Sequence, residues 1–562
     1  MHHHLSLRSK IIIMASVMAS LFLVALDQTI ISTALGRIVE EFNAYDSLSW
    51  IVTAYLLTTT ITVPIAGKLS DLFGRKVMLL IGVGVFGLGS LMSGLAGDVN
   101  QLVLWRAFQG IGGGIISANA FTIIGDLFTS RERGRWQGMI GAVFGLSSVV
   151  GPLLGGWLTD KQQILGLSTD WRWTFFINVP VALVAFFLIT TYCPPLKHAS
   201  KHRIDYAGAA LLSLALATLV LAVDNTETIF KDVMNELHLS LSGLRIIMAA
   251  IVVVATALFV WKERRAAQPI LPLRFFKNRT YSLTMIVATL FGAAFMGSIL
   301  YLTQFNQQVF GASPTESGLM LLPMVAGIMI ASIGSGQMIS RTGKYKRFME
   351  FGVVLGTIMI GLLTTLTPET PYVYEAIMMV FLGLGLGFVM PVMNIAVQNE
   401  FEQRDLGAAT SSIQLFRGLG STIGIAIFGA ILTAGLTANL HGVEDSRYVQ
   451  MIAKSPAAHK MGDISSSNTL LNLNMPELKT KITNGFEAST KEMPPTIQAA
   501  ANKQFAQDQA EYSQKIVHAF SKSLRDIFVV SAALMGVAAI TVFFVKEKEL
   551  KHETTKRSSG VE

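Results

Sequence analysis

Long apolar stretches, each about 20 residues, follow one another along most of this chain and limit its possible folds more than any other feature. A helix needs about 20 such residues to cross roughly 30 Å of hydrocarbon. Strands of a membrane barrel would be shorter and would alternate in polarity, so helices are expected. A composition of 51% hydrophobic and 14% charged residues also departs from that of soluble domains. We therefore predict an all-α, multi-pass membrane protein.

The apolar segments predict fourteen transmembrane helices. They cover residues 11 to 34, 48 to 66, 77 to 96, 102 to 125, 136 to 158, 173 to 192, 205 to 223, 243 to 261, 280 to 303, 316 to 338, 348 to 366, 373 to 398, 407 to 434 and 526 to 545. We divide the chain into an N-terminus at 1 to 10, a six-helix half at 11 to 192, two inserted helices within 193 to 279, a second six-helix half at 280 to 545 and a tail at 546 to 562.

The distribution of basic residues gives the predicted orientation. Lys and Arg collect in short cytoplasmic loops of membrane proteins. If the N-terminus is cytoplasmic, the alternate segments on that side hold 27 of the 44 Lys and Arg, and the short loops on the other side hold five. An error of one helix would remove this contrast. Both termini are therefore expected in the cytoplasm.

The start of the chain and its cysteine content carry less information. The apolar run after the basic first ten residues contains Asp27 and lacks a small-residue cleavage site, so we interpret it as a membrane helix and not a removed signal. Cys193 is the single cysteine, which excludes an intrachain disulfide.

A weak internal repeat links the two halves. "GKLSDLFGRK" at 67 to 76 follows predicted helix 2, and "GQMISRTGKYKR" at 336 to 347 follows predicted helix 10. The glycines align, but Asp71 of the first copy meets Ser340 in the second. Paired repeats of this kind are typical of transporters.

Residues 435 to 525 interrupt the hydrophobic pattern with a long polar segment, which the predicted topology places outside the cell. Apolar residues at helical spacing from Phe505 to Leu524 predict a helix that runs directly into helix 14. The preceding stretch, 462 to 485, is expected to be irregular or to form a hairpin.

Four motifs carry a resemblance to a known family: "LDQTIISTAL" in helix 1, "GKLSDLFGRK" after helix 2, "RAFQGIGGG" in helix 4 and "GLSSVVGPLLGGWL" in helix 5. Together and in this order they resemble the major facilitator superfamily, and within it the fourteen-helix drug/proton antiporters. The match covers nearly all of the chain except 435 to 525. It implies two six-helix halves and proton-coupled export.

Asp27 is the first candidate for the proton carrier. A carboxylate within a membrane helix costs about 2.5 to 3.5 kcal/mol and is a functional candidate by default. We identify Asp27 as the one acid clearly inside an apolar segment, and all ten histidines fall in loops or termini. The alternative is a structural residue hydrogen-bonded to Thr29 or to a neighbouring helix. Ser32 and Gly36 depart from the family motif near the outer end of helix 1.

Arg106 begins the helix 4 motif and is followed by Gln109 and four glycines, which allow a neighbouring helix to pack closely over the charge. The resemblance implies that Arg106 assists proton transfer. The alternative is an arginine that extends to the membrane interface. Arg417 in helix 13 is a second candidate for a buried arginine.

The helix 5 motif combines small residues with a proline, which provides close-packing faces and a kink. Its members are Gly141, Gly145, Gly151, Pro152, Gly155 and Gly156. This signature resembles antiporters more than symporters, and we expect it to form a tight interface with a helix of the other half. Packing without a transport role is the simpler alternative.

The charges of the "GKLSDLFGRK" motif predict a cytoplasmic gate. Gly67 and Gly74 allow a sharp turn, and the positive-inside rule accounts for Lys68, Arg75 and Lys76 but not for an aspartate between them. A carboxylate is stabilised at a helix N-terminus. The resemblance suggests that Asp71 binds the start of helix 13, near residues 406 to 409, and holds the two halves together on the cytoplasmic side.

A cavity between the halves is expected near the midplane. Our candidates for its lining are Gln28, Trp50, Tyr55, Gln109, Asn119, Asn394, Gln414 and Arg417, each of which has packing as an alternative role. The 25 Met and 33 Phe suit adaptable binding of amphipathic molecules. One deep acid favours neutral or monocationic cargo.

We therefore predict a proton-coupled exporter of amphipathic drugs and dyes in a bacterial plasma membrane. The alternative cargo is an endogenous amphiphile such as a lipid, siderophore or antibiotic, with 435 to 525 assisting release or binding an envelope partner. The sequence contains no G-x-x-x-x-G-K-[ST] motif and no recognisable catalytic constellation. We accordingly expect no enzyme activity, no cofactor, no metal and no nucleic-acid partner.

Overall fold

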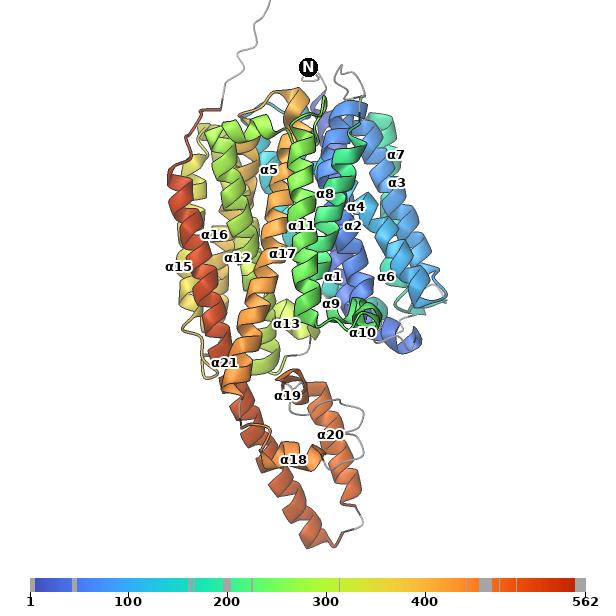
Figure 1. Ribbon diagram of the computed structural model, residues 1–562, viewed down its shortest axis with the longest axis vertical. Coiled ribbons are helices and arrows are strands. Elements are labelled where there is room, and N and C mark those ends of the chain that lie inside the picture. The colour runs from blue at the N-terminus through green and yellow to red at the C-terminus, as the bar shows by residue number, and fades with distance from the viewer. Residues whose placement is uncertain are drawn as a thin grey trace, which may run out of the picture.

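The computed structural model describes residues 6–42, 48–159, 163–164, 167–195, 204–223, 226–312, 314–440, 442–453, 467–474, 476–491 and 493–550. Long helices stand side by side in a bundle, and a smaller helical part projects from one end (Figure 1). The chain's N-terminal end lies at the opposite end of the bundle. The prediction of an all-α protein is confirmed.

The first half contains the helices α1 (Leu7–Phe42), α2 (Leu48–Phe73), α3 (Arg75–Gly94), α4 (Val99–Leu127), α5 (Glu132–Thr159), α6 (Trp173–Phe176) and α7 (Asn178–Tyr192). Two-residue strands β1 (Gln163–Ile164) and β2 (Leu167–Ser168) pair antiparallel after α5, with Gln163 opposite Ser168. The structure extends predicted helix 1 to residue 42. It also divides predicted helix 6 into α6 and α7 at Ile177.

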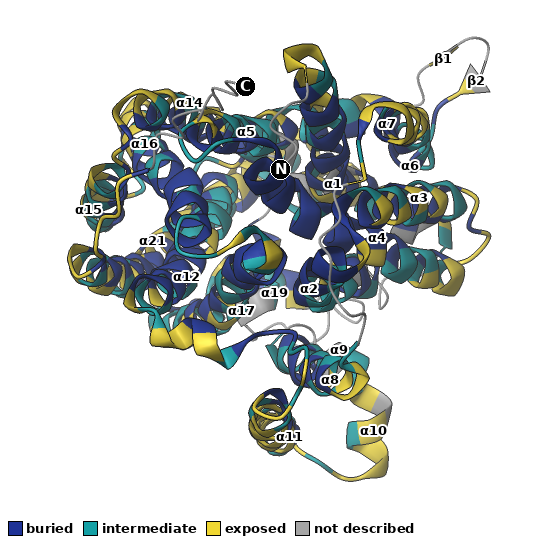
Figure 2. Ribbon diagram, turned by 90° about the horizontal axis from the view of Figure 1, so that it is seen from above, coloured by how far each residue is buried: buried dark blue, intermediate teal, exposed yellow. Residues whose placement is uncertain are grey.

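The inserted region contains α8 (Tyr206–Val223), α9 (Thr226–Ile229), α10 (Lys231–Glu236) and α11 (Leu241–Glu263). It leads through the 3-10 helix η3 (Leu273–Lys277) into the second half. Leu212 and Leu216 of α8 pack with Ile61 and Ile65 of α2. Viewed from above, α8 and α11 lie beside the main bundle (Figure 2). The insertion is therefore peripheral, and the two halves meet without it.

The second half contains α12 (Arg279–Val309), α13 (Pro314–Met320), α14 (Leu322–Thr342), α15 (Lys346–Leu363), α16 (Tyr372–Gln398), η4 (Gln403–Asp405), α17 (Leu406–Asn439) and α21 (Pro495–Phe543). Predicted helix 10 is divided at Leu321 into α13 and α14. Pro323 accounts for the division because proline has no N–H to donate and is best tolerated in the first turn of a helix.

Among the described residues, thirteen helices are long and apolar enough to cross a membrane. The predicted segment 348 to 366 is not among them. It corresponds to α15, an 18-residue helix whose first turns carry Lys346, Arg347 and Glu350. α15 nevertheless packs within the second half between α16 and α21.

The apolar core is divided in the same way as the helices. One cluster joins buried side chains of α1, α3, α4, α5 and α7, and a larger one joins α12, α14, α15, α16, α17 and α21. Each half therefore has its own core, which is what allows one half to move against the other without unfolding.

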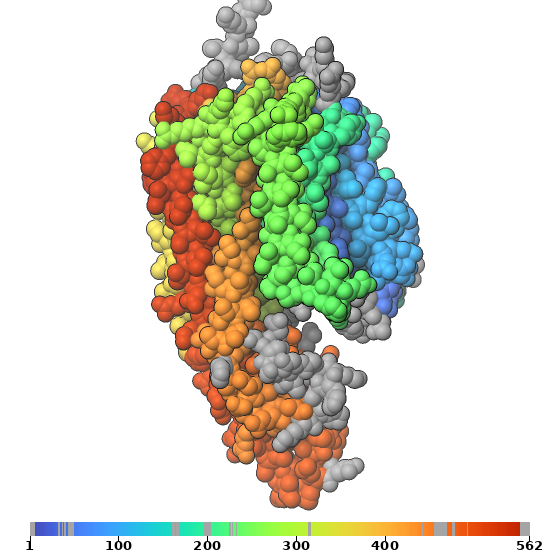
Figure 3. Space-filling view, in the orientation of Figure 1, coloured from blue at the N-terminus to red at the C-terminus, as the bar shows by residue number. Residues whose placement is uncertain are grey.

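The part that projects from the bundle consists of α18 (Arg447–Ala453), α19 (Ser467–Leu473), α20 (Pro476–Ser489) and the first half of α21. In the space-filling view it forms a narrow extension below the bundle (Figure 3). α21 is continuous over 49 residues, as the helical spacing from Phe505 predicted. Tyr512 is buried in this part and donates to the Leu470 carbonyl at 2.5 Å.

The prediction that 462 to 485 is irregular or a hairpin is wrong for the described part of that range, where α19 and α20 are helices. Residues 462–466 and 475 lie outside the described residues. Their helical neighbours bury Leu470 and Leu473 against α21, and Phe486 stacks on Phe505 at 4.2 Å. Burial against α21 overrides a polar local composition.

Candidate functional site

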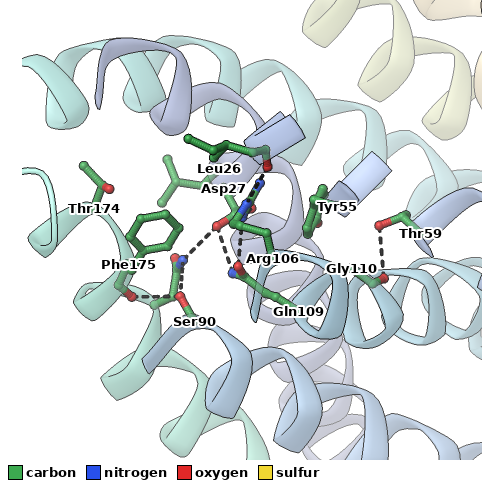
Figure 4. Close-up of polar contacts among 12 residues, drawn as sticks. Leu26, Asp27, Tyr55, Thr59, Ser90, Arg106, Gln109, Gly110, Thr174 and Phe175 are labelled. Carbon is green, nitrogen blue, oxygen red and sulfur yellow. Dashed lines mark hydrogen bonds and ion pairs between the residues drawn. The ribbon is translucent and has the colours of Figure 1, made fainter. Parts of the chain in front are cut away.

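The centre of the first half holds a buried ion pair between α1 and α4. Arg106 Nη1 lies 2.6 Å from Asp27 Oδ2, and both side chains are at most 1% exposed. Gln109, one turn beyond Arg106, donates to Asp27 Oδ1 at 2.9 Å and accepts from Arg106 Nη1 at 2.8 Å. Figure 4 shows the three side chains converging from their two helices. Three of the sequence candidates therefore form one unit.

The pair is enclosed by a second set of polar and aromatic groups. Asn178 of α7 donates to Asp27 Oδ1 at 3.3 Å and to Ser90 Oγ at 3.0 Å. The guanidinium of Arg106 lies 4.3 Å from the ring centre of Tyr55 and 5.7 Å from that of Phe175. These contacts compensate two charges that would otherwise be costly away from water.

The geometry decides between the earlier alternatives for Arg106. A side chain that is 1% exposed and paired with Asp27 does not extend to the interface. Thr29 donates to the carbonyl of Ser147 on α5 at 3.0 Å. Asn178 was not among the predicted site residues, although an asparagine within the apolar run 173 to 192 is itself an available signal.

The expected contact between Asp71 and the start of α17 is present. Asp71 Oδ1 accepts from the Gly407 N–H and Oδ2 from the Ala408 N–H, both at 2.9 Å. The side chain is 3% exposed. These two amides belong to the first turn of α17, where N–H groups have no partner within the helix. A carboxylate of the first half thus caps a helix of the second half.

Arg75 holds Asp71 from the other side. Its guanidinium lies 2.5 Å from Asp71 and 2.7 Å from Asp126 of α4, and it also donates to Ser70. Asp126 was not among the predicted site residues, because it follows directly after the segment predicted to end at 125. Lys76, by contrast, is half-buried and donates to the Thr190 carbonyl of α7 at 2.7 Å, so it does not take part in the contact between halves.

The glycines of this motif have different physical roles. Gly74 has a φ of 96°, a backbone conformation that side chains disfavour, and it separates α2 from α3. A side chain on Gly67 would overlap Ser411 of α17. Gly67 is therefore needed for close approach of the halves, and Gly74 for the turn.

The second copy of the repeat forms a different contact. Gly343 has a φ of 74°, matching the turn at Gly74, and Arg131 Nη1 reaches the Arg341 carbonyl at 3.4 Å. Ser340 provides no carboxylate. The contact between halves on this side is thus asymmetric, as the repeat comparison led us to expect.

Residues 138 to 145 of α5 pack directly against α14 of the other half. Side chains built on Gly138 and Gly141 would meet the backbone and hydroxyl of Ser332, and one on Gly145 would lie 2.7 Å from Met329. This is the tight interface that the helix 5 motif predicted.

The remaining members of that motif do not share this interface. Gly151 faces Thr29 of α1 in its own half, Gly155 is buried, and a Cβ on Gly156 would meet nothing within 4 Å. Pro152 lies near α13, 3.7 Å from a Cβ built on Gly318. The motif therefore serves three contacts, of which two join the halves.

The candidates for the cavity lining fall into separate groups. Tyr55 and Gln109 belong to the Asp27 cluster, and Gln414 accepts from Arg417 on α17 at 2.6 Å. Asn119 and Asn394 each donate to a carbonyl one turn earlier in their own helix. Gln28 is exposed and Trp50 half-buried. Asn119 and Asn394 are thus bonded within their helices, and the candidates do not form one group.

Asp27 is not the one acid inside an apolar segment, and that part of the sequence analysis is wrong. Glu375 of α16 is fully buried within the predicted segment 373 to 398. Its position near the start of the segment concealed it. Among the described residues, no group of three or more His, Cys, Asp and Glu is placed to hold a metal ion.

Comparisons with known proteins agree with this architecture. The family model described as Major Facilitator Superfamily matches residues 17–425. The chain belongs to the major facilitator superfamily. It is 31% identical to the multidrug transporter protein MdtP of Bacillus subtilis over 96% of this chain and 94% of that protein. It is 34% identical to multidrug resistance protein 3 of the same organism, covering 95% of each.

Solved structures show the same fold. The proton:xylose symporter XylE superposes with a TM-score of 0.57 at 15% identity, covering 96% of this chain and 97% of XylE. The human organic anion transporter MFSD10 superposes with a TM-score of 0.55 at 16% identity, covering 75% and 93%. At this identity the likeness concerns the fold of the superfamily and not the cargo.

Replacing Asp71 by asparagine is expected to open the cytoplasmic side. Loss of a helix cap costs about 0.5–2 kcal/mol, and each 1.4 kcal/mol is tenfold in population. In a chain whose Cys193 is changed to alanine, a cysteine placed at the buried Thr410 should therefore react several-fold to about tenfold faster with a maleimide added from the cytoplasmic side.

Asp98→Asn is the matched control for this experiment, because Asp98 caps α4 within its own half by accepting from the Gln101 N–H at 2.9 Å. It should leave the reaction rate unchanged. Equal rates in the parent and in Asp71→Asn would show that Asp71 does not hold the halves together.

Proposed function

We propose that this protein is a proton-coupled antiporter that exports small amphipathic compounds across a bacterial plasma membrane by alternating access. The observation that carries the proposal is the buried Asp27–Arg106 pair with its Gln109 and Asn178 hydrogen bonds. Relatives named as multidrug transporters over nearly the whole chain support the direction and the type of cargo.

In this proposal Asp27 is the proton carrier and Arg106 is its counter-ion. The ionised carboxylate attracts the guanidinium, and a proton on Asp27 removes that attraction, so the two protonation states favour different arrangements of α1 and α4. Gln109 and Asn178 position the carboxylate in the paired state. Coupling follows because a change at α1 reaches α5, whose Ser147 carbonyl accepts from Thr29.

The contacts between the halves support one position for the described conformation in this cycle. Asp71 on α17 and the α5–α14 glycine interface both join the halves on the side where the basic loops lie. We infer that the cytoplasmic entrance is closed in this state. Export then requires that these contacts break before cargo enters and form again before it leaves.

The proposed cargo is neutral or monocationic. A membrane potential contributes about 2.3 kcal/mol per charge per 100 mV, so exchange of one proton for such a compound is driven at least by the pH difference. The alternative cargo, an endogenous amphiphile guided by 435 to 525, would be favoured by an exposed apolar face on α21. The apolar residues Phe505, Tyr512 and Ile516 of α21 are instead buried, so this alternative is not favoured.

The test is ethidium-driven proton release from vesicles containing the reconstituted protein. We expect release with the parent and complete loss of coupled release with Asp27→Asn at equal amounts of folded protein. Asp170→Asn is the matched control, because Asp170 is 43% exposed in an ion pair with Arg172 and lies outside the site. Unchanged coupling in Asp27→Asn would assign the proton to another group.

A further inference from the structure

A second buried acid lies in the other half, away from the Asp27 cluster. Glu375 is in the first turns of α16 and is 0% exposed. Asn306 of α12 is also fully buried, and with its amide nitrogen turned toward the carboxylate it lies 2.9 and 3.0 Å from the two oxygens. Neither residue contributes to the cluster described above.

No cation compensates Glu375 among the described residues. The charged residues of the helices packed on α16 lie far from it along those helices: Arg279 of α12, Arg341 of α14, Lys346, Arg347 and Glu350 of α15, Glu132, Arg133 and Arg135 of α5, and Arg417 of α17. Tyr372, one turn earlier, and Tyr374, the preceding residue, are the titratable side chains beside it on α16. Burying an unpaired carboxylate is costly, so a carboxyl in this position readily takes up a proton.

Asn306 suits both forms of the acid. Its amide nitrogen can donate to an ionised carboxylate, and its amide oxygen can accept from the O–H of a protonated one. The N-terminus of α16 stabilises the ionised form, whereas burial stabilises the neutral form. A metal cation would need several more oxygen ligands than these two side chains offer. The ligand that fits this site is therefore a proton.

The site is connected to a contact between the halves through α13. Gln307, next to Asn306, donates to Ser317 of α13 at 2.9 Å. Tyr372 donates to the Met320 carbonyl at the end of α13 at 2.8 Å. α13 in turn meets Pro152 of α5 at Gly318. α12 and α16, which carry Asn306 and Glu375, therefore both bond to α13, the helix that contacts the other half.

We propose that Glu375 and Asn306 form a second proton-binding site, at the extracytoplasmic end of the second half, whose protonation changes the contact of α13 with Pro152. The site would exchange protons with the outside, whereas Asp27 lies within the first half. This inference rests on the proposed proton-coupled function and adds a second proton to it.

The experiment is infrared difference spectroscopy of the full chain in lipid, comparing acidic with alkaline buffer. We expect the parent to show a protonated-carboxyl C=O band that disappears on raising the pH and that is missing from Glu375→Gln. Glu369→Gln is the control, because Glu369 lies just before α16 with a side chain that is 67% exposed. A band that is unchanged in Glu375→Gln would overturn the proposal.

Proton release separates this inference from the proposed function. Glu375→Gln, in which the amide keeps the shape of the side chain, should release fewer protons per ethidium than the parent and more than Asp27→Asn. Release equal to that of the parent would remove Glu375 from coupling. If the parent itself released no protons, the proposed function would fail, and the infrared band would still decide whether Glu375 binds a proton.

Discussion

Replacement of Arg106 by glutamine is expected to destabilise the protein by about 3–5 kcal/mol, because it leaves the buried carboxylate of Asp27 without its counter-ion. Gln109 and Asn178 remain as hydrogen-bond donors to Asp27, but neither carries charge. The measurement is the fraction of monodisperse protein that remains in detergent after heating, compared with the parent over a series of temperatures.

The double variant Asp27→Asn/Arg106→Gln tests the reason for this loss. Replacing both members of a buried pair by neutral groups of similar volume is often neutral for stability. We therefore expect the double variant to recover most of the stability lost in Arg106→Gln while remaining inactive in coupled proton release. Equal instability of the single and double variants would mean that Arg106 acts through packing against Tyr55 and Phe175 and not through its charge.

Gly138→Val is expected to prevent closure of the cytoplasmic side. A Cβ at this position would overlap the carbonyl of Ser332, a backbone atom of α14 that cannot move aside as a side chain can. Overpacking of this kind costs about 1–3 kcal/mol. α5 and α14 belong to different halves with separate cores. The substitution should therefore destabilise the closed state relative to the open state and leave the free energy of folding of each half unchanged.

The cysteine reaction at Thr410 measures this effect as well, and Gly138→Val should raise the rate. Transport should fall because an exporter that cannot close its cytoplasmic side cannot release cargo outside. Gly156→Ala is the control on the same helix, since a Cβ there meets nothing within 4 Å. A slow reaction in Gly138→Val together with normal transport would show that α5 and α14 do not limit closure.

The two proton sites and the cytoplasmic contacts suggest how the halves communicate. In the proposed cycle Asp27 acts on α1 and α5 and Glu375 acts on α12, α16 and α13. α5 packs against both α13 and α14 of the second half. α5 is thus the helix through which either acid can affect the other half. In the same proposed cycle, the carboxylate cap at Asp71 limits when the cytoplasmic side opens.

The sequence by itself determined the properties that depend on one segment at a time. Hydropathy located the membrane helices, and the basic loops predict their orientation, because each segment meets lipid or water independently of its neighbours. Asp27, Arg106 and Asp71 were identifiable because a charge in or beside an apolar helix costs free energy, so such a residue is a functional candidate by default. The superfamily followed from motifs within single helices.

The tertiary structure alone decided which of these groups meet. Asp27 and Arg106 are 79 positions apart, and Asp71 and Gly407 are 336 apart. Asp126, Asn178 and Glu375 became visible as members of sites only when packing removed them from water and gave each a partner on another helix. Burial and pairing depend on which helix faces pack together in three dimensions. The spacing of residues along one helix does not specify which other helix it packs against.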